Sequence, residues 1–126
     1  MTDNIQKLYE IAGIKEKRGV ELTVDPTSEE PKFNEHYVCY GYPPFTAEKQ
    51  LELIKFVSNF KVYEMVKYKN RKWFMCASIG CDDYYESRSE SFDQALANLI
   101  INLWQDLIND QKQEIKKILQ WQINKH

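Results

Sequence analysis

The cysteines and histidines of this sequence are its strongest candidates for metal ligands. One set of four ligands could come from His36, Cys39, Cys76 and Cys81. An imidazole and three thiolates suit tetrahedral zinc. Cys76, however, falls in the middle of an apolar strand pattern, where a cysteine packs as a small apolar residue. We therefore expect no essential metal and no other cofactor, and the odd number of cysteines indicates reduced thiols rather than disulfides.

A second reactive group is an acidic run that contains one cation, Arg88. Paired carboxylates at a turn can bind a divalent metal or act as a general acid and base. No nucleophile or histidine stands at a recognisable catalytic spacing from them, and turn formation with favourable charge near a helix start explains them more simply. We therefore expect a protein that is not an enzyme, with a small hydrolase as the third choice of function. The run consists of Asp82, Asp83, Glu86, Glu90 and Asp93.

A third group interleaves cations with aromatic rings over residues 61–73. Cations neutralise phosphate while rings stack on bases, which is the chemistry of nucleotide binding. Lysines on an outward face also keep a β-hairpin soluble, and this simpler explanation stays open. A tyrosine-rich run before Pro43 suits either a protein interface or an ordinary core. From the two segments we predict a binding site made of Tyr37, Tyr40, Tyr42, Lys67, Lys69, Arg71 and Lys72.

Both segments are expected beside one helix. Pro43-Pro44 leads into a helix capped by Thr46, and Phe60 follows the end of that helix, so both segments can lie on one side of a sheet. Residues 61–72 hold five cations and one acid, whereas residues 82–93 hold five acids and one cation. Such a polar axis would orient a charged partner before contact.

The strands that position these residues follow from their alternation. Residues 73–79 have two apolar faces and predict a central strand covered on both sides. An antiparallel strand over residues 60–69 precedes it across a hairpin at Asn70-Arg71, and a return strand over residues 84–88 follows a turn at residues 80–83. Residues 20–24 predict an edge strand, and residues 37–42 a further strand.

The helices follow from apolar residues at helical spacing. A first short helix ends at Gly13, and a second begins at Thr46. Ser91 with Gln94 three residues on predicts a capping box for the longest helix, and Asp110 with Gln113 repeats the pattern for a C-terminal helix. The element order predicts an α+β fold, an antiparallel sheet of three to five strands with helices on one or both faces, as in an α/β/α sandwich.

At 126 residues with 43% hydrophobic content, the chain is expected to form one domain. Its core would span about 36–108, with a mobile charged segment over about 14–34 and a C-terminal helix over about 110–124. No stretch approaches the roughly 20 apolar residues that span a bilayer, and a formal net charge of -2 does not favour membrane or general nucleic-acid binding, so we expect a cytoplasmic protein. An aromatic content of 13% exceeds what a small core readily covers and predicts a homodimer.

Three stretches resemble a known family. They are Pro44-Phe45-Thr46-Ala47-Glu48-Lys49-Gln50-Leu51 opening a helix, the hairpin around Lys72-Trp73, and Ser89-Glu90-Ser91-Phe92 leading into Ala95-Leu96. Over about residues 45–106 this pattern resembles the small phage and prophage accessory proteins called the phage ABA sandwich family. The resemblance implies a protein made in a bacterial host cell and assigns no catalytic or binding residue.

These observations together predict a non-catalytic binding protein, phage- or prophage-encoded, that inhibits host defence by binding a host protein or by sequestering a nucleotide-like small molecule. The alternative is a nucleic-acid-binding accessory or regulatory protein that uses the same basic hairpin. Salt separates the two, because counterion release makes nucleic-acid binding steeply salt-dependent.

Overall fold

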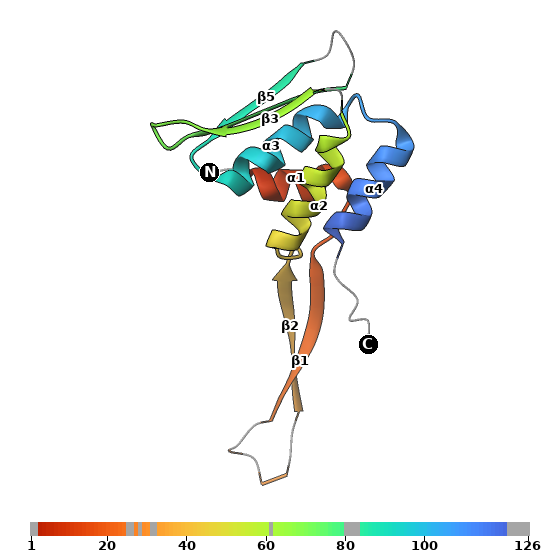
Figure 1. The fold of residues 1–126 in the computed structure, drawn as a ribbon. Coiled ribbons are helices and arrows are strands. Elements are labelled where there is room, and N and C mark those ends of the chain that lie inside the picture. The colour runs from red at the N-terminus through yellow and green to blue at the C-terminus, as the bar shows by residue number, and fades with distance from the viewer. Residues whose placement is uncertain are drawn as a thin grey trace.

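The computed structural model of the chain describes residues 3–24, 27, 29–30, 33–60, 62–79 and 84–120. Figure 1 shows a body, in which helices lie beneath a three-stranded sheet, and a long two-stranded hairpin that leaves the body on the side away from this sheet. We call the hairpin the arm. It consists of β1 (Lys17–Val24) and β2 (Phe33–Gly41), which pair antiparallel.

The sheet of the body is antiparallel throughout and has the order β3-β4-β5. Its strands are β3 (Val62–Lys67), β4 (Trp73–Ser78) and β5 (Tyr85–Ser89). The predicted central strand, its hairpin and the return strand are confirmed. The turn predicted at residues 80–83 lies outside the described residues.

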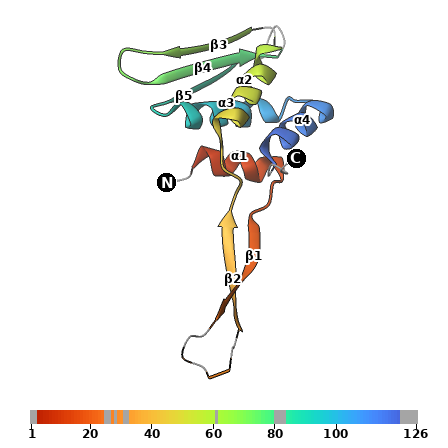
Figure 2. The same cartoon turned by 60° about the horizontal axis from the view of Figure 1, so that its bottom comes forward.

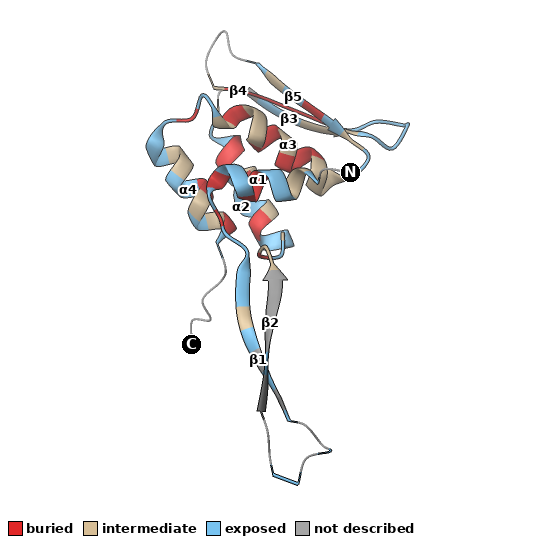
Figure 3. Ribbon diagram, turned by 180° about the vertical axis from the view of Figure 1, so that it is seen from behind, coloured by how far each residue is buried: buried red, intermediate tan, exposed pale blue. Residues whose placement is uncertain are grey.

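Four helices form the layer beneath the sheet: α1 (Asn4–Ala12), α2 (Ala47–Ser58), α3 (Phe92–Trp104) and α4 (Asn109–Leu119). In Figures 1 and 2, α3 lies directly under β4 and β5, and α1 packs against α3 from below. Figure 3 shows buried residues concentrated in α3 and the elements that surround it. The shared core includes Leu8, Leu53, Met75, Leu96, Leu99, Leu103 and Ile115.

The outer face of the sheet is covered differently. Phe74, Cys76 and Ser78 alternate with the core-facing residues of β4, yet each is less than 9% exposed. Long side chains from neighbouring segments cover Phe74, since the Arg88 guanidinium lies over its ring and the Tyr68 ring packs beside it. The predicted α+β fold with an antiparallel sheet on helices is confirmed. The described helices occupy one face of the sheet, so among the described residues the body has two layers and lacks the second helix layer of the predicted α/β/α sandwich.

The arm contains two strands that the sequence analysis assigned to the sheet of the body. The predicted edge strand at residues 20–24 is confirmed as part of β1, and it gives regular structure to a segment that we expected to be mobile. Both arm strands pair with each other instead of joining the sheet of the body. Pairing across one short connection costs less chain entropy than crossing to a distant strand.

The first helix is capped at both ends, and its C-terminal cap is the expected Gly13. The Asp3 carboxylate accepts a hydrogen bond from the Ile5 N–H at 2.8 Å. Gly13 follows the helix with φ 77°, a left-handed conformation that glycine adopts without a steric cost.

The capping box predicted for α3 is not formed. The Ser91 hydroxyl donates a hydrogen bond to the Asp93 carboxylate, and the Ser91 side chain accepts no hydrogen bond from the backbone at the start of the helix. Gln94 turns away to α1, where its Oε1 accepts from the Asn4 N–H at 2.9 Å and its Nε2 donates to Asp3 at 2.7 Å. Gln94 therefore satisfies open donors at the start of α1 and ties that helix to α3.

The capping box predicted at Asp110 and Gln113 is not formed, and only the glutamine half of a box is present at the start of α4, because the Ile108 side chain has no atom that accepts a hydrogen bond. α4 begins earlier, and the Ile108 N–H donates to Gln111 Oε1 at 3.0 Å. The predicted end of this helix, residues 121–124, lies outside the described residues. Across the part of the chain that the structure describes, the helices are too short and too polar to cross a membrane.

Candidate ligand-binding cleft

The basic hairpin ends in a turn that its own backbone closes. The Tyr68 N–H donates to the Lys72 carbonyl and the Arg71 N–H to the Tyr68 carbonyl, each at 2.9 Å, and Asn70 Oδ1 accepts from the Lys72 N–H at 3.1 Å. Arg71 has φ 66°, a left-handed conformation that costs a residue with a side chain about 1 kcal/mol. The turn thus keeps a cation at a position that glycine would occupy with less strain.

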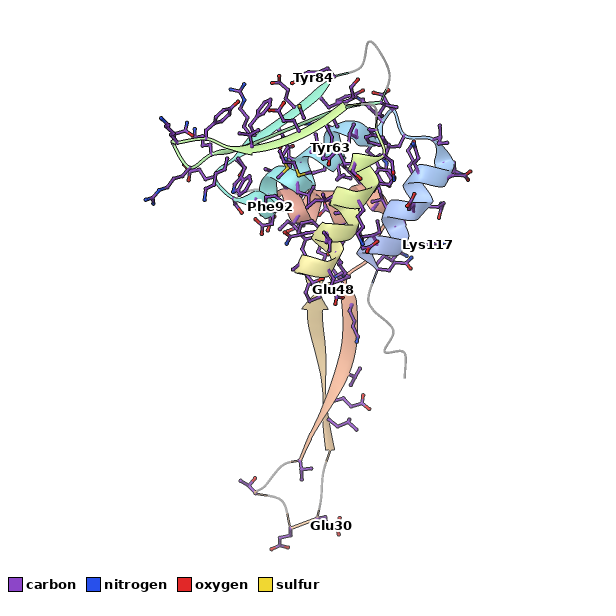
Figure 4. All side chains as sticks on the ribbon, viewed as in Figure 1. Glu30, Glu48, Tyr63, Tyr84, Phe92 and Lys117 are labelled. Carbon is purple, nitrogen blue, oxygen red and sulfur yellow. The ribbon has the colours of Figure 1, made fainter. Side chains whose placement is uncertain are left out.

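β5 brings a second group of polar residues to this end of the sheet. Its register places Arg88 opposite Phe74 and Ser89 opposite Trp73. The chain then enters α3, whose first residue, Phe92, packs its ring edge against Trp73 with centroids 4.9 Å apart. Figure 4 shows Phe92 beneath the sheet at the end that carries the turn.

These segments enclose a cleft of about 350 Å³, which we call the sheet-end cleft. Its volume lies in the range of about 300–1,000 Å³ that is usual for small-molecule sites. Its lining combines aromatic rings, two cations, one acid, an amide and a hydroxyl. The residues are Tyr68, Asn70, Lys72, Trp73, Arg88, Ser89 and Glu90.

One cation of the cleft, Arg88, and one cation outside its lining, Lys67, lie over aromatic rings. On the outer face, the Arg88 Cζ atom lies 5.2 Å from the centroid of Phe74, and Glu86 holds the same guanidinium through an ion pair of 3.9 Å. On the inner face, Lys67 Nζ lies 5.6 Å from the centroid of Trp73. Contacts of this kind restrict the cations before any ligand arrives, which reduces the entropy lost on binding.

The charge distribution differs from the separated poles that the sequence suggested. Glu90, the next-to-last acid of the predicted acidic run, lines the same cleft as Lys72. Antiparallel pairing of β4 and β5 causes this, because it brings the end of β5 back to the turn between β3 and β4. Asp82 and Asp83 lie outside the described residues.

The structure separates the two halves of the predicted binding site. Tyr37 and Tyr40 lie on the arm, on the opposite side of the helices from the basic hairpin (Figures 1 and 2), and the positions of their side chains are not described. Tyr42 stacks on Tyr9 of α1, with centroids 5.5 Å apart and planes 5° apart. Tyr42 therefore contributes to packing within the body, and removing its ring would disturb the fold.

The four basic residues of the prediction stay together. Lys72 lines the sheet-end cleft, Lys67 lies over Trp73, and Lys69 and Arg71 are exposed on the turn. Sequence reasoning missed Arg88, Ser89 and Glu90 as their neighbours. The predicted pairing of the return strand with the central strand could have indicated these neighbours. The register of that pairing, however, depends on the turn at residues 80–83, whose geometry the sequence does not reveal.

A buried lysine was also missed. Lys49 of α2 is 4% exposed, and its Nζ donates to the Leu119 carbonyl at the end of α4 at 3.2 Å. Burial lowers the pKa of Lys49 and raises that of the adjacent Tyr9 to about 12. A cation is favourable at a helix C-terminus, so this contact holds α4 against α2 and explains Lys49 as a structural residue.

The structure describes the side chain of one of the four metal ligands considered from the sequence. Cys76 lies within β4 and is 2% exposed, Cys81 lies outside the described residues, and the side chains of His36 and Cys39 are not described. Among the residues that are described, no three histidine, cysteine or acidic side chains cluster as metal ligands. A side-chain hydrogen bond to Cys76 is the largest cause that raises the pKa of Tyr84 to about 12. This thiol thus packs beneath the edge of the outer face, where Figure 4 shows Tyr84.

Comparisons of the chain with protein-family models, curated proteins and solved structures found no match. The resemblance to phage accessory proteins stays a prediction.

Proposed function

We propose that this chain is a non-catalytic binding protein that holds a nucleotide-like ligand in the sheet-end cleft. The observation that supports the proposal is the meeting of a half-exposed Tyr68 ring, 49% exposed, with Lys72 and Arg88 around one cleft. An exposed ring stacks on a base, and the two cations neutralise phosphate. Asn70 and Glu90 then offer acceptors for the amino group of a base.

In a cell, such a protein would act by sequestration. A phage- or prophage-encoded chain that removes a small nucleotide-like signal would weaken a host defence that depends on that signal. The contact of the Arg88 guanidinium with the Phe74 ring favours ligand binding because it limits the positions that the guanidinium takes before a ligand arrives.

Isothermal titration calorimetry tests this proposal with two probes, ATP and a twelve-nucleotide single-stranded DNA. Stacking on one ring is worth about 1–3 kcal/mol, so Tyr68→Leu should weaken ATP binding by about fivefold or more. Arg88→Ala should do the same, and Arg88→Lys should recover only part of the loss because lysine lacks the planar fork. Lys117→Ala on the exposed face of α4 is the matched control and should bind as the wild type does.

Salt decides between the two kinds of ligand. ATP binding should weaken only several-fold between 50 and 200 mM salt, whereas a protein that contacts six or more phosphates of a single strand loses about three-hundredfold or more in affinity. Steep salt dependence with DNA alone would support the nucleic-acid-binding alternative. Binding of neither probe at millimolar concentration, or equal binding by all variants, would exclude the sheet-end cleft as the site.

A further inference from the structure

The arm presents an apolar stripe that nothing in the described chain covers. Val20, Leu22 and Val24 occupy alternate positions of β1 and are 49%, 63% and 56% exposed. Alternate residues of a strand share one face, so the three side chains form one continuous stripe. Figures 1 and 2 show the arm extending into solvent away from the helices.

An isolated two-stranded hairpin is marginally stable in water, and its open edges and apolar face invite pairing with another chain. β1 has eight residues, so the arm reaches about 26 Å beyond the body at about 3.3 Å per residue. A projection of this length is available to a partner without any change in the body. The apolar stripe is therefore a candidate interface with another molecule.

The distribution of charge along the arm indicates which molecule packs on the apolar stripe. At its base, residues 15–18 contain three cations, Lys15, Lys17 and Arg18, against Glu16. At its tip, Glu29 and Glu30 are exposed, and Figure 4 shows Glu30 at the far end from the body. The arm is thus positive at one end and negative at the other, which makes it complementary to a second arm that runs in the opposite direction.

We infer that two copies of this chain associate through their arms, packed antiparallel with apolar stripe against apolar stripe. Leu22 lies midway between Lys17 at the base and Thr27 near the tip, so full overlap places it beside the two-fold axis. Val20 of one copy then faces Val24 of the other. Such an isologous contact forms every interaction twice. It places the acidic tip of each arm beside the positively charged end of the other copy's arm, where that arm joins its body.

Light scattering coupled to size-exclusion chromatography tests the inference on the full chain between 1 and 100 μM. The wild type should elute with twice the 15.1 kDa chain mass. The triple variant Val20→Thr, Leu22→Thr and Val24→Thr keeps strand-forming residues and should raise the dissociation constant at least tenfold. Leu51→Thr, which changes a similarly exposed apolar residue on α2, should leave the dimer intact.

Charge reversal provides a second measurement that does not depend on the stripe. Lys15→Glu with Arg18→Glu, and separately Glu29→Lys with Glu30→Lys, should each weaken association because like charges then meet twice. Mixing the two variants should restore a heterodimer, since every base–tip pair is again opposite in sign. A monomeric wild type at 100 μM, an unchanged dimer in the triple variant, or no recovery on mixing would overturn the inference. Unchanged far-ultraviolet circular dichroism of each variant shows that the body remains folded.

Discussion

Tyr9 allows a sharp test of how the core is built. Its side chain is fully buried, and its ring stacks on Tyr42 and meets the Phe45 ring edge-on at 6.4 Å. Its hydroxyl has no hydrogen-bond partner among the described residues. The substitution Tyr9→Phe keeps these ring contacts and removes only the hydroxyl group.

The expected gain in stability follows from two opposing terms. An unpaired buried hydroxyl costs about 1–3 kcal/mol, whereas losing the packing of one oxygen atom costs a few tenths of a kcal/mol. Tyr9→Phe should therefore raise the free energy of unfolding at pH 7 by about 1 kcal/mol. For a domain of this size, the melting temperature should rise by about 3–6 °C.

Alkaline pH should enlarge this difference. Burial raises the pKa of Tyr9 from 10.0 to about 12, so between these values the unfolded phenol loses its proton while the folded one keeps it. The stability that comes from the neutral phenol is therefore complete below pH 10 and is lost as the pH rises through 12. At pH 11 the free energy of unfolding of the wild type should be lower than at pH 7 by at most about 1.4 kcal/mol because of this residue. The Tyr9→Phe variant should not show this decrease, because phenylalanine does not titrate.

Urea unfolding followed by circular dichroism at pH 7 and pH 11 measures both effects. Tyr63→Phe removes a hydroxyl from a residue that is 46% exposed and should stay within about 0.5 kcal/mol of the wild type at pH 7. If Tyr9→Phe instead lowers stability at pH 7 by 1 kcal/mol or more, the hydroxyl has a partner and the reasoning fails. A difference that does not change with pH would refute the assigned shift of the pKa.

Three further substitutions, the first with a control, test other parts of the structure. Leu99→Ala should lower the free energy of unfolding by about 2–5 kcal/mol because the side chain is fully buried, whereas exposed Lys117→Ala should change it by less than about 0.5 kcal/mol; equal urea midpoints would contradict this. Gln94→Ala should cost about 1–2 kcal/mol through lost hydrogen bonds at the start of α1, with faster hydrogen exchange in that helix, and unchanged exchange would argue against the link. Arg71→Gly should raise the free energy of unfolding by up to about 1 kcal/mol, because glycine relieves the strain at φ 66°; a lower melting temperature would contradict the strained turn.

The fold of the body was largely predictable because its signals are local. Alternation in residues 73–79 identified β4, and the apolar spacing from Leu96 to Leu103 identified α3. Capping was harder to predict. Gln94 stands at the spacing of a capping box in its own helix, yet its amide reaches α1, ninety residues earlier in the chain. A local motif cannot reveal that a distant donor competes for the same side chain.

The candidate site was only partly predictable for a related reason. The basic residues from Lys67 to Lys72 are consecutive or nearly so, and a single hairpin keeps them together. Tyr42 and Arg88 were misjudged, because their surroundings depend on which strands pair. Once β1 takes β2 as its partner, the tyrosine run leaves the sheet, and once β5 pairs with β4, Arg88 joins the hairpin. Alternation shows that a segment is a strand, but it does not show which strand it pairs with.

The attachment of the arm has an evolutionary consequence. Lys17 pairs with Gly41 in the ladder, so the chain leaves the body and re-enters it at neighbouring points. A connection one quarter as long would join the same points with about 1.2 kcal/mol less closure entropy, and the core would lose none of its contacts. The arm therefore has the geometry of an insertion, because its length can change while the contacts of the body stay the same. Descendants of a common ancestor could share this body and differ in the partners that their insertions recruit.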